Sequence, residues 1–406
     1  MIATEYCKNV FDGTHDSPKF LDNGYLLVTS KNIANRELDL TGANFISEED
    51  FNKINERSKV HQWDIFFSMI GTVGNVFLQT EKEVNYAIKN MGVFSCENED
   101  KAKWLYYYLQ SPYFKKLMNS LLSGAVQKFV PLGFLRSIDI PKYDDNKKAI
   151  VKFLSSLDDK IALNNRINAK LEQMAKRLYD YWFVQFDFPN ADGKPYKSTG
   201  GKMVWNEELK REIPEGWEVK KLGDVCEIVL GGTPSTANNE FWENGTINWL
   251  NSGEVGIFPI VESEKKITEI AVEKSTTEFL KAGSVTLSIT RYLRPSILAI
   301  DACINQSVVG IKENDLFKNC FLYPYLQNEI DRLMSLRTGA QQPHINKEIV
   351  EDSFINILSK ELMEKYEKKV TPIYLQIINI AKETQKLTML RDRLLPLLMN
   401  GQVEVR

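Results

Sequence analysis

The chain repeats itself at an offset of about half its length. Residues 104–111 read WLYYYLQS and residues 321–328 read FLYPYLQN, which is an offset of 217 (321 − 104). A Ser-Gly-Ala at 123–125 is matched by Thr-Gly-Ala at 338–340, in the same order along the chain. Solenoids of short units recur every few tens of residues, so a repeat this long indicates a duplicated domain with its connector. We therefore expect two similar sites held at a fixed separation.

Length, charge and cysteine usage narrow the class of protein. A chain of 406 residues is long enough for two or three domains with their own cores. No apolar run approaches about 18 residues and no signal-like amino terminus is present, so we expect a cytoplasmic protein. The five cysteines form no Cys-x-x-Cys pair and are typical of reduced thiols. The net charge of −3 argues against a strongly basic nucleic-acid binder acting alone, unless the basic residues gather on one face or partners contribute.

The pattern of apolar and turn-forming residues changes four times along the chain. Residues 1–142 alternate short apolar runs with turn residues, which predicts a mixed domain of strands and helices. Residues 143–184 carry apolar side chains at spacings of three and four, which predicts a helix of about 33 residues, on the order of 50 Å long. Residues 185–215 have no sustained period and are predicted to be a linker. A second mixed domain is expected at 216–358, and a second helical region with a tail at 359–406.

The two helical regions are predicted to pack on each other as an antiparallel coiled coil. Such a helix is longer than a domain of about 140 residues is wide, since that domain has a radius of gyration of about 14 Å. The alternative is that each apolar seam covers only its own domain. Asn164 and Asn168 correspond in the repeat to Ile380 and Thr384, and they either fix the register of the pair or are solvated. Pro372 is expected to kink the second helix or to mark its start.

An ordered set of short motifs runs through the whole chain. The set consists of DGTHDSP at 12–18, SMIGTVG at 68–74, FDFP and GKPYKSTGGKMVW within 186–205, IPEGWEVKKLGDV at 213–225, GGTPST at 231–236, INWLNSGE at 247–254 and RLLPLLMNGQVEV at 393–405. Together they resemble the DNA-specificity subunit of a Type I restriction-modification system. No single motif is decisive, whereas the order and the half-chain repeat are highly specific.

This resemblance implies both a fold and a function. The fold would be mixed α/β (α+β), with two duplicated target-recognition domains, at 1–142 and 216–358, joined by two long helices with pseudo-two-fold symmetry. The function would be non-catalytic, namely reading a bipartite, asymmetric target in double-stranded DNA and holding two modification (methyltransferase) subunits and the restriction subunits. The chain itself would need no cofactor. The methyltransferase partner is implied to use S-adenosylmethionine, and the restriction partner ATP and Mg²⁺.

The residues agree with a non-catalytic reading. No Gly-x-x-x-x-Gly-Lys phosphate loop and no Asn-Pro-Pro-Tyr methyltransferase motif is present. The three histidines are too dispersed to suggest a metal site. Two competing functions stay open at this point: a stand-alone nuclease or methyltransferase, and a protein-protein adaptor that never contacts DNA. Titration of the chain against random duplex over a salt series would discriminate between them.

The two domains differ in two places. The first begins near Thr4 without a counterpart of the strand expected at 217–222, so another segment, such as 402–405, is expected to complete its edge. The second domain reads SITRYLR at 288–294 where the first has the glycine-rich turn at 68–74. The two domains are therefore expected to read different DNA sequences.

Candidate DNA-binding residues lie in loops beside the repeated landmarks. Base edges are read by Arg or Lys at guanine and by Asn or Gln at adenine. The candidates are Ser30, Lys31, Asn32, Thr72, Gln127 and Lys128 in the first domain, and Ser252, Thr290, Arg291, Tyr292, Arg294, Gln341, Gln342 and His344 in the second. For each, the alternative is an ordinary solvated loop or a phosphate contact. Four charged helix residues are candidates for binding the partner subunits: Lys160, Arg166, Lys170 and Lys176.

The aromatic cluster at 104–108 invites a base-stacking interpretation. Its recurrence at 321–325, at the same place in a predicted helix, favours the protein core instead.

Overall fold

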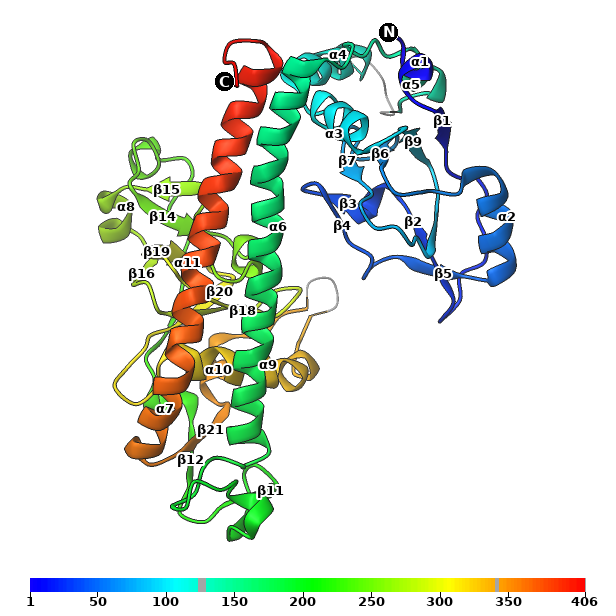
Figure 1. Ribbon diagram of the computed structural model, residues 1–406. Coiled ribbons are helices and arrows are strands. Elements are labelled where there is room, and N and C mark those ends of the chain that lie inside the picture. Colours follow the sequence, from blue (N-terminus) through cyan, green and yellow to red (C-terminus); the bar gives the residue numbers. More distant parts are fainter. Residues whose placement is uncertain (123–128, 340–342, 406) are drawn as a thin grey trace. The chain divides into compact units, whose positions relative to one another are not determined.

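The computed structural model describes residues 1–122, 129–339 and 343–405, and these form two compact units. Unit 1 comprises Met1–Ile161 and Leu387–Arg406, and unit 2 comprises Ala162–Lys386. The two long helices, α6 (Asp145–Tyr179) and α11 (Lys360–Met399), each run from one unit into the other (Figure 1). Each unit thus contains one globular domain and a stretch of both helices.

Unit 1 is built on a four-stranded antiparallel sheet in the order β1-β9-β6-β7. A second sheet has the order β5-β2-β8, in which β2 and β8 are parallel. The strands are β1 (Asn9–Asp12), β2 (Tyr25–Val28), β3 (Ile33–Ala34), β4 (Glu37–Leu38), β5 (Asn44–Ile46), β6 (Asp64–Ser68), β7 (Val76–Leu78), β8 (Tyr86–Ile88) and β9 (Met91–Ser95). The helices are α1 (Ala3–Tyr6), η1 (Ser30–Asn32), α2 (Glu48–Ser58), α3 (Glu99–Tyr108), α4 (Pro112–Leu122) and α5 (Leu132–Ser137).

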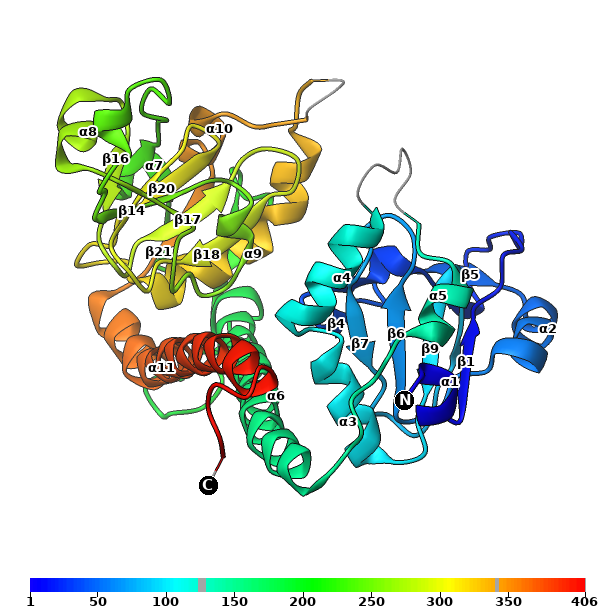
Figure 2. The same cartoon turned by 90° about the horizontal axis from the view of Figure 1, so that it is seen from above.

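The core of unit 1 lies between this sheet and its helices. Every residue of β6 is buried, as expected for an interior strand that is covered on both faces. Helix α3, which Asn98 caps by accepting a hydrogen bond from Lys101 N, lies beside β7 (Figure 2). Its Trp104 and Tyr107 are 3% and 2% exposed, which confirms the core interpretation of the aromatic cluster. The far end of α11 joins the same core through Leu395 and Leu398.

Unit 2 repeats this architecture. Its main sheet has the order β13-β20-β17-β18, and its second sheet the order β15-β14-β19-β16, in which β14 and β19 are parallel. The strands are β10 (Met203–Asn206), β11 (Arg211–Pro214), β12 (Glu218–Lys221), β13 (Ile228–Leu230), β14 (Ile247–Leu250), β15 (Lys265–Ile267), β16 (Glu278–Leu280), β17 (Val285–Ser288), β18 (Arg294–Ile297), β19 (Ala302–Ile304), β20 (Val308–Ile311) and β21 (Phe354–Ile357). The helices are η2 (Asp180–Val184), η3 (Lys197–Thr199), α7 (Leu222–Val225), η4 (Asn239–Phe241), η5 (Glu254–Gly256), α8 (Glu269–Lys274), α9 (Asn319–Ser335) and α10 (Lys347–Glu351).

The duplication read from the sequence is confirmed strand by strand. Strands β1, β9, β6 and β7 correspond in sequence order and pairing to β13, β20, β17 and β18. The parallel pair β2 and β8 corresponds to β14 and β19. Strand β16 is an addition of unit 2, because the second sheet of unit 1 ends at β8. The mixed α and β fold class is therefore confirmed.

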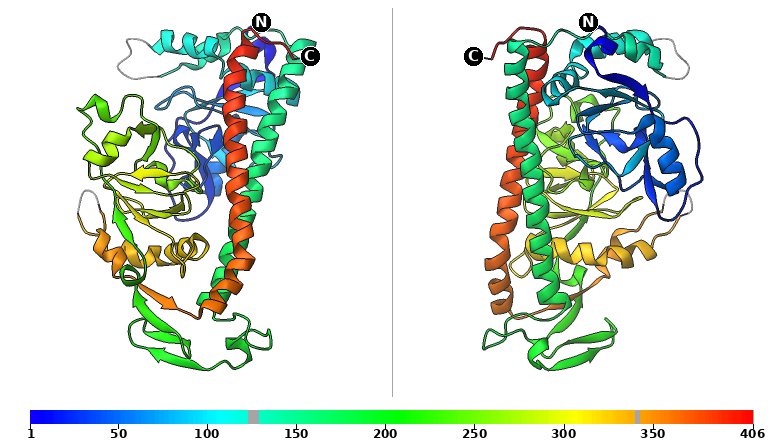
Figure 3. Two further views of the ribbon diagram at one scale, coloured as in Figure 1. Left: turned by 90° about the vertical axis from the view of Figure 1, so that its left-hand side faces the viewer. Right: turned by 45° about the vertical axis from the view of Figure 1, so that its right-hand side comes forward.

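The segment predicted to be a linker, 185–215, folds onto unit 2. It contains the hairpin of β10 and β11 (Figure 3). Phe186 and Phe188 pack their rings 5.5 and 5.3 Å from that of Trp217, and Ile213 is 2% exposed. The predicted domain limits stay a prediction, because these contacts describe packing and not function.

Helices α6 and α11 run antiparallel within each unit (Figures 1 and 3). In unit 2, Asn164 Nδ2 donates to Glu383 Oε2 (2.8 Å) and Asn168 Nδ2 to the Ile377 carbonyl (3.2 Å). Asn164 is 1% exposed, so its geometry favours the register role over solvation. Pro372 lies inside α11, which begins at Lys360, so the prediction that it marks the helix start is wrong. Pro372 is exposed, and water can reach the carbonyl that lacks its amide partner.

The edge of unit 1 is completed by its own first residues. Ile2 forms a bridge with Asp139, Ala3 N donates to the Ile138 carbonyl (2.8 Å), and Ile140 N donates to the Met1 carbonyl (2.8 Å). In unit 2 the longer pair of β12 and β21 occupies this place. The expectation that residues 402–405 supply the edge is wrong, since they form turns and irregular backbone. Within the described ranges, no helix is both long and apolar enough for a membrane span.

Candidate nucleic-acid interface

Each unit carries a loop held in the same backbone frame at the end of a central strand. In unit 1, Val130 N donates to the Met69 carbonyl (3.0 Å), and Ile70 and Phe129 form a bridge. We call residues 69–75 together with 129–130 tip 1. The frame is a short strand-like pairing, so it fixes the direction of the side chains that it presents.

The same frame recurs in unit 2. Ile345 N donates to the Ile289 carbonyl (3.1 Å), and Thr290 and His344 form the bridge. We call residues 289–294 together with 343–345 tip 2. The preceding serines, Ser68 and Ser288, both hydrogen bond through Oγ to a carbonyl two residues later, at 3.4 Å in each case.

Tip 2 brings together several residues predicted from the sequence. Arg291 has a positive φ of 58°, and its N donates to the Pro343 carbonyl (3.0 Å). Its own carbonyl accepts a hydrogen bond from Arg337 Nη1 (2.9 Å). Thr338 and His344 exchange two backbone hydrogen bonds, of 2.9 and 3.0 Å. Thr290, Arg291 and His344 are thus neighbours although they lie up to 54 positions apart in the sequence (344 − 290).

Tip 2 is cationic and carries an exposed aromatic ring. Tyr292 is 66% exposed, so its ring does not belong to the core of unit 2. The guanidinium of Arg294 lies 5.4 Å from its ring centroid, within cation–π distance. Among the residues that the structure describes, neither Arg291 nor Arg294 is paired with a carboxylate. Their charge is available to an anionic or electron-rich ligand.

The turn that contains Ser252 lies against tip 2. A Cβ built on Gly256 would come within 3.1 Å of Arg294 Cδ, and Ser296 Oγ donates to the Ile257 carbonyl (2.6 Å). Ser252 itself is half-buried. The neighbouring Asn251 is committed to the turn, since its Nδ2 donates to Glu254 Oε2 (2.6 Å).

In unit 1 the predicted residues separate into two groups. Asn32 is 7% exposed, its Oδ1 accepts from Thr29 N (2.9 Å), and its Nδ2 donates to the Asp39 carbonyl (2.9 Å), so its geometry favours a structural role. Lys31 and Thr72 are exposed and Ser30 is half-buried.

A side-chain hydrogen bond joins these segments of unit 1. Asn75 Nδ2 donates to the Ile33 carbonyl (2.8 Å), which ties β3, the strand directly after η1, to tip 1. The four remaining candidates, Gln127, Lys128, Gln341 and Gln342, lie outside the described residues.

Three residues were missed by the sequence analysis: Ile70 and Phe129 in tip 1, and Arg337, whose side chain supports tip 2. Hydrogen-bonding side chains were expected to read base edges, and Ile70 and Phe129 are apolar. The repeat could have indicated Phe129, because it lies 215 positions before the candidate His344 (344 − 129), at the offset of the repeat. Arg337 lies one residue before the Thr-Gly-Ala that begins at Thr338.

The predicted partner-binding residues lie along α6. Lys160, Arg166 and Lys170 are exposed. Lys176 is instead held in unit 2, where its Nζ contacts Asp180 Oδ1 and Oδ2 at 2.9 and 2.8 Å and Asn328 Oδ1 at 2.8 Å. Its geometry favours a role in docking α9 on α6.

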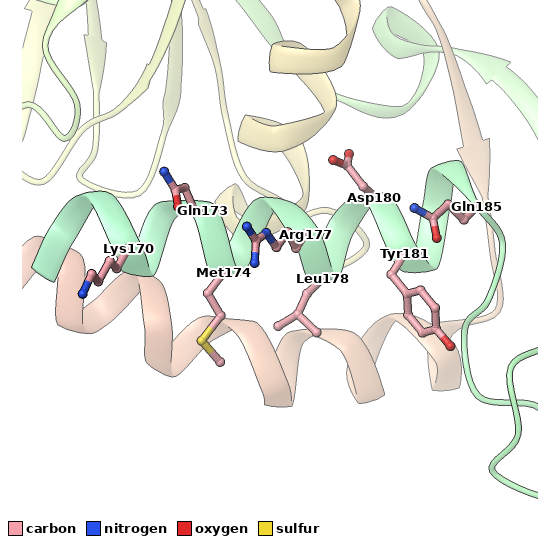
Figure 4. Close-up of a pocket in the computed structure, with 8 residues that line it drawn as sticks. All are labelled: Lys170, Gln173, Met174, Arg177, Leu178, Asp180, Tyr181 and Gln185. Carbon is pink, nitrogen blue, oxygen red and sulfur yellow. The ribbon is translucent and has the colours of Figure 1, made fainter. Parts of the chain in front are cut away.

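A cavity of about 740 Å³ opens along the end of α6 in unit 2. Its lining residues are Lys170, Gln173, Met174, Arg177, Leu178, Asp180, Tyr181 and Gln185. Met174, Leu178 and Tyr181 point to one side of the helix (Figure 4). Met174 is 53% exposed and Tyr181 38%, so this side offers apolar surface next to a lysine and an arginine.

The cysteines of the described residues are poorly suited to nucleophilic catalysis. All five cysteines are buried, and burial raises the pKa of Cys226 and Cys303 to about 11 and that of Cys320 to about 12. Such thiols stay protonated at neutral pH and are poor nucleophiles. Over the described ranges, no group of three or more His, Cys, Asp and Glu side chains could hold a metal ion.

Comparison with known proteins places both halves of the chain in one group. A family model described as Type I restriction modification DNA specificity domain matches residues 14–173 and again residues 214–388. The MjaIX specificity subunit of a Type I restriction enzyme from Methanocaldococcus jannaschii is 26% identical over 319 residues, which cover 75% of this chain and 69% of that protein. The HindI specificity subunit from Haemophilus influenzae is 25% identical over 408 residues, which cover 86% of this chain and 88% of that protein.

A solved structure shares the fold. The crystal structure of the Type-I restriction-modification system S subunit from M. genitalium superposes with a TM-score of 0.56 at 15% identity, covering 98% of this chain and 95% of that one. The relatives named here are specificity subunits, so the chain groups with the non-catalytic components of such systems.

Proposed function

Since the chain belongs to the family of Type I restriction modification DNA specificity domains, we propose that it binds double-stranded DNA at a target of two unequal halves. Each globular domain reads one half, and bases between the halves are not read. The spacing of the halves is set by α6 and α11, the two helices that both units share.

One observation carries this proposal: the tips share a backbone frame and differ in their side chains. Tip 1 and tip 2 have the same bridge at the end of corresponding strands. At the bridge, unit 1 has Ile70 and Phe129 where unit 2 has Thr290 and His344. A protein that recognises two different half-sites needs the same backbone arrangement in both domains and different side chains on it.

Tip 2 has the chemistry to read guanine and adenine. Arg291 and Arg294 can each present a bidentate donor pair to guanine O6 and N7. Gln342, which lies outside the described residues, has a side chain of the type that pairs with adenine. Arg337 supports the backbone of Arg291 from behind, through its hydrogen bond to the Arg291 carbonyl. Tyr292 and His344 add a stacking surface and a further polar group.

The helices are proposed to hold the partner subunits. Lys160, Arg166 and Lys170 on α6 would contact two modification subunits, with long stems that can cover apolar partner surface. Those subunits would supply S-adenosylmethionine-dependent methylation, and restriction subunits would supply ATP- and Mg²⁺-dependent cleavage. The specificity chain would bring no cofactor of its own.

The test is binding of the full chain, assembled with its modification subunit, to a randomised duplex library. Selected sites should contain two unequal halves around an unread spacer, and binding should weaken steeply with salt. Arg291→Ala or Arg294→Ala should cost about 1 to 3 kcal/mol and relax one base position of one half only.

Lys220→Ala removes an exposed cation on β12 and serves as the matched control. A uniform loss over all sequences in the arginine variants would show phosphate contacts only. A continuous or palindromic site would refute the two-domain reading, and salt-independent, unselective behaviour would point to an adaptor that does not contact DNA.

A further inference from the structure

Tip 1 presents two apolar side chains to solvent from a hydrogen-bonded backbone. Ile70 is 39% exposed and Phe129 is 45% exposed, although each is next to a nearly inaccessible residue, Met69 at 2% and Val130 at 0%. The hydrogen bond from Val130 N to the Met69 carbonyl and the bridge between Ile70 and Phe129 hold the pair in place. The inward residues anchor the tip in the core of unit 1, and the outward residues are left for a ligand.

The position of this pair in the repeated frame narrows what that ligand is. Its counterpart in unit 2, Thr290 with His344, belongs to the tip that also contains Arg291 and Arg294, and neither arginine is paired with a carboxylate among the described residues. If that cationic tip faces DNA, the corresponding tip of unit 1 faces DNA as well. An apolar pair there can neither donate to nor accept from a base edge, so its selectivity must be for an apolar group.

The major groove offers one apolar group on its base edges, the 5-methyl group of thymine. We infer that Ile70 and Phe129 form an apolar contact with a thymine methyl group in the half-site read by unit 1, and thereby specify an A·T pair there. This inference rests on the proposed function, because it names what one of the two proposed readers recognises.

The contact has a direct test, since uracil in DNA differs from thymine only by that methyl group. Once the split site is known, each thymine of either strand is replaced by uracil in turn, and binding of the assembled full chain is measured. One position in the first half should show about a fourfold loss, which is the ratio for one buried methyl group at about 0.8 kcal/mol. Uracil in the half read by unit 2 serves as the internal comparison.

Variants of the pair should remove this preference. Ile70→Asn with Phe129→His places polar side chains at both bridge positions, and the thymine-to-uracil ratio should fall to about one because no apolar side chain is left there. Phe129→Leu keeps an apolar side chain and should retain most of the preference. Tyr113→Ala removes another exposed aromatic of unit 1, at 61% exposure on α4, and should leave the ratio unchanged.

Several outcomes would overturn the inference while leaving the proposed function intact. One is a first half-site made only of G·C pairs, and another is a thymine-to-uracil ratio of one at every position. A third is loss of assembly with the modification subunit in the Ile70 and Phe129 variants with unchanged base preference, which would make the pair a protein contact. Absence of any selective DNA binding by the wild-type assembly would instead defeat the proposed function itself.

Discussion

Replacing Arg391 by methionine should loosen unit 1 and leave unit 2 unaffected. Arg391 is 8% exposed on α11, and its Nη1 lies 2.7 Å from Asp158 Oδ1 on α6, while its Nε lies 2.9 Å from Asp392 Oδ1. Burial lowers the pKa of the guanidinium, but the hydrogen bonds that it donates to Asp392 and Asp158 more than offset this effect, so the pKa is raised. Asp158 also accepts a hydrogen bond from Tyr107 Oη on α3 (2.6 Å), which joins three helices through one carboxylate.

The expected loss of stability depends on the hydrogen-bond partners that each carboxylate retains in Arg391→Met. Asp392 has a half-exposed side chain and keeps Arg36, whose Nη2 lies 3.1 Å away, so its loss counts little. The Asp158 side chain is 26% exposed and keeps the Tyr107 hydroxyl, with Arg36 only at 3.9 Å. A hydrogen bond to a charged group contributes about 1.5 to 3 kcal/mol, so we expect a loss of about 2 to 3 kcal/mol, below the value for a fully buried pair.

Native-state hydrogen exchange measures this loss in one unit at a time. The slowest amides of α3 should exchange about 30- to 150-fold faster in Arg391→Met, since about 1.4 kcal/mol corresponds to a factor of ten. The slowest amides of α9 should be unchanged. Glu172→Gln is the matched control in unit 2, where Glu172 accepts from Tyr323 Oη (2.7 Å), and it should accelerate α9 alone.

A double-mutant cycle with Asp158→Asn decides whether the ion pair is responsible. The double variant should cost about 1 to 2 kcal/mol less than the two single variants combined, because the second change removes a partner that is already lost. Strict additivity would refute the reasoning and reduce Arg391 to a packing residue. Equal acceleration in α3 and α9 would show that the network does not belong to unit 1 alone.

Inserting seven helical residues after Ile161 and seven after Lys386 should lengthen both helices by about 10 Å. The unread spacer should then widen by about three base pairs, with both half-sites unchanged, when the methylated sites are mapped. An unchanged spacer would refute the proposal that the helices set the spacing. Burial raises the pKa of Asp64 in the folded state. Its carboxylate charge therefore destabilises the fold fully at pH values above the raised folded pKa, and not at all below the unfolded pKa of about 4, where the group is protonated in both states. Asp64→Asn should therefore gain stability over wild type as pH rises through that window in chemical unfolding, and a difference independent of pH would contradict this assignment. Finally, the five buried cysteines should react with a thiol reagent at neutral pH only after unfolding, and rapid labelling of the native chain would contradict their burial.

The duplication and the long helices could be predicted from the sequence because both depend on periodicity. Apolar residues at spacings of three and four are local signals, and the antiparallel pairing of α6 with α11 follows from their matching seams. The edge formed by Met1–Ala3 was not foreseen, because Ile2 pairs with a residue 137 positions away (139 − 2) and no local pattern announces such a partner. The hairpin of β10 and β11 was missed because its flanks are rich in turn residues.

The candidate site was predicted in outline and less well in detail. Tip 2 assembles around Arg291 and His344 as a set of loops beside the repeat landmarks, which sequence spacing could indicate. Asn32 has a suitable side chain for reading a base, but burial and two internal hydrogen bonds decide otherwise, and burial of a single polar residue is a tertiary property. Ile70 and Phe129 lay outside a search confined to hydrogen-bonding groups.

The participation of α11 in the core of unit 1 has a consequence for biosynthesis. Leu395 and Leu398, each 4% exposed, lie in the same cluster as Ala3 and Ile150, although the ribosome adds Leu395 234 residues after Ile161, where the first segment of that unit ends (395 − 161). The first domain to emerge is thus the last to be completed, and it waits with an uncovered apolar surface while unit 2 is made. A premature stop codon before Leu395 would remove burial worth about 3 to 6 kcal/mol from the opposite end of the polypeptide, at 1.5 to 3 kcal/mol for each leucine. Nonsense mutations in the codons of α11 would therefore cause misfolding of unit 1.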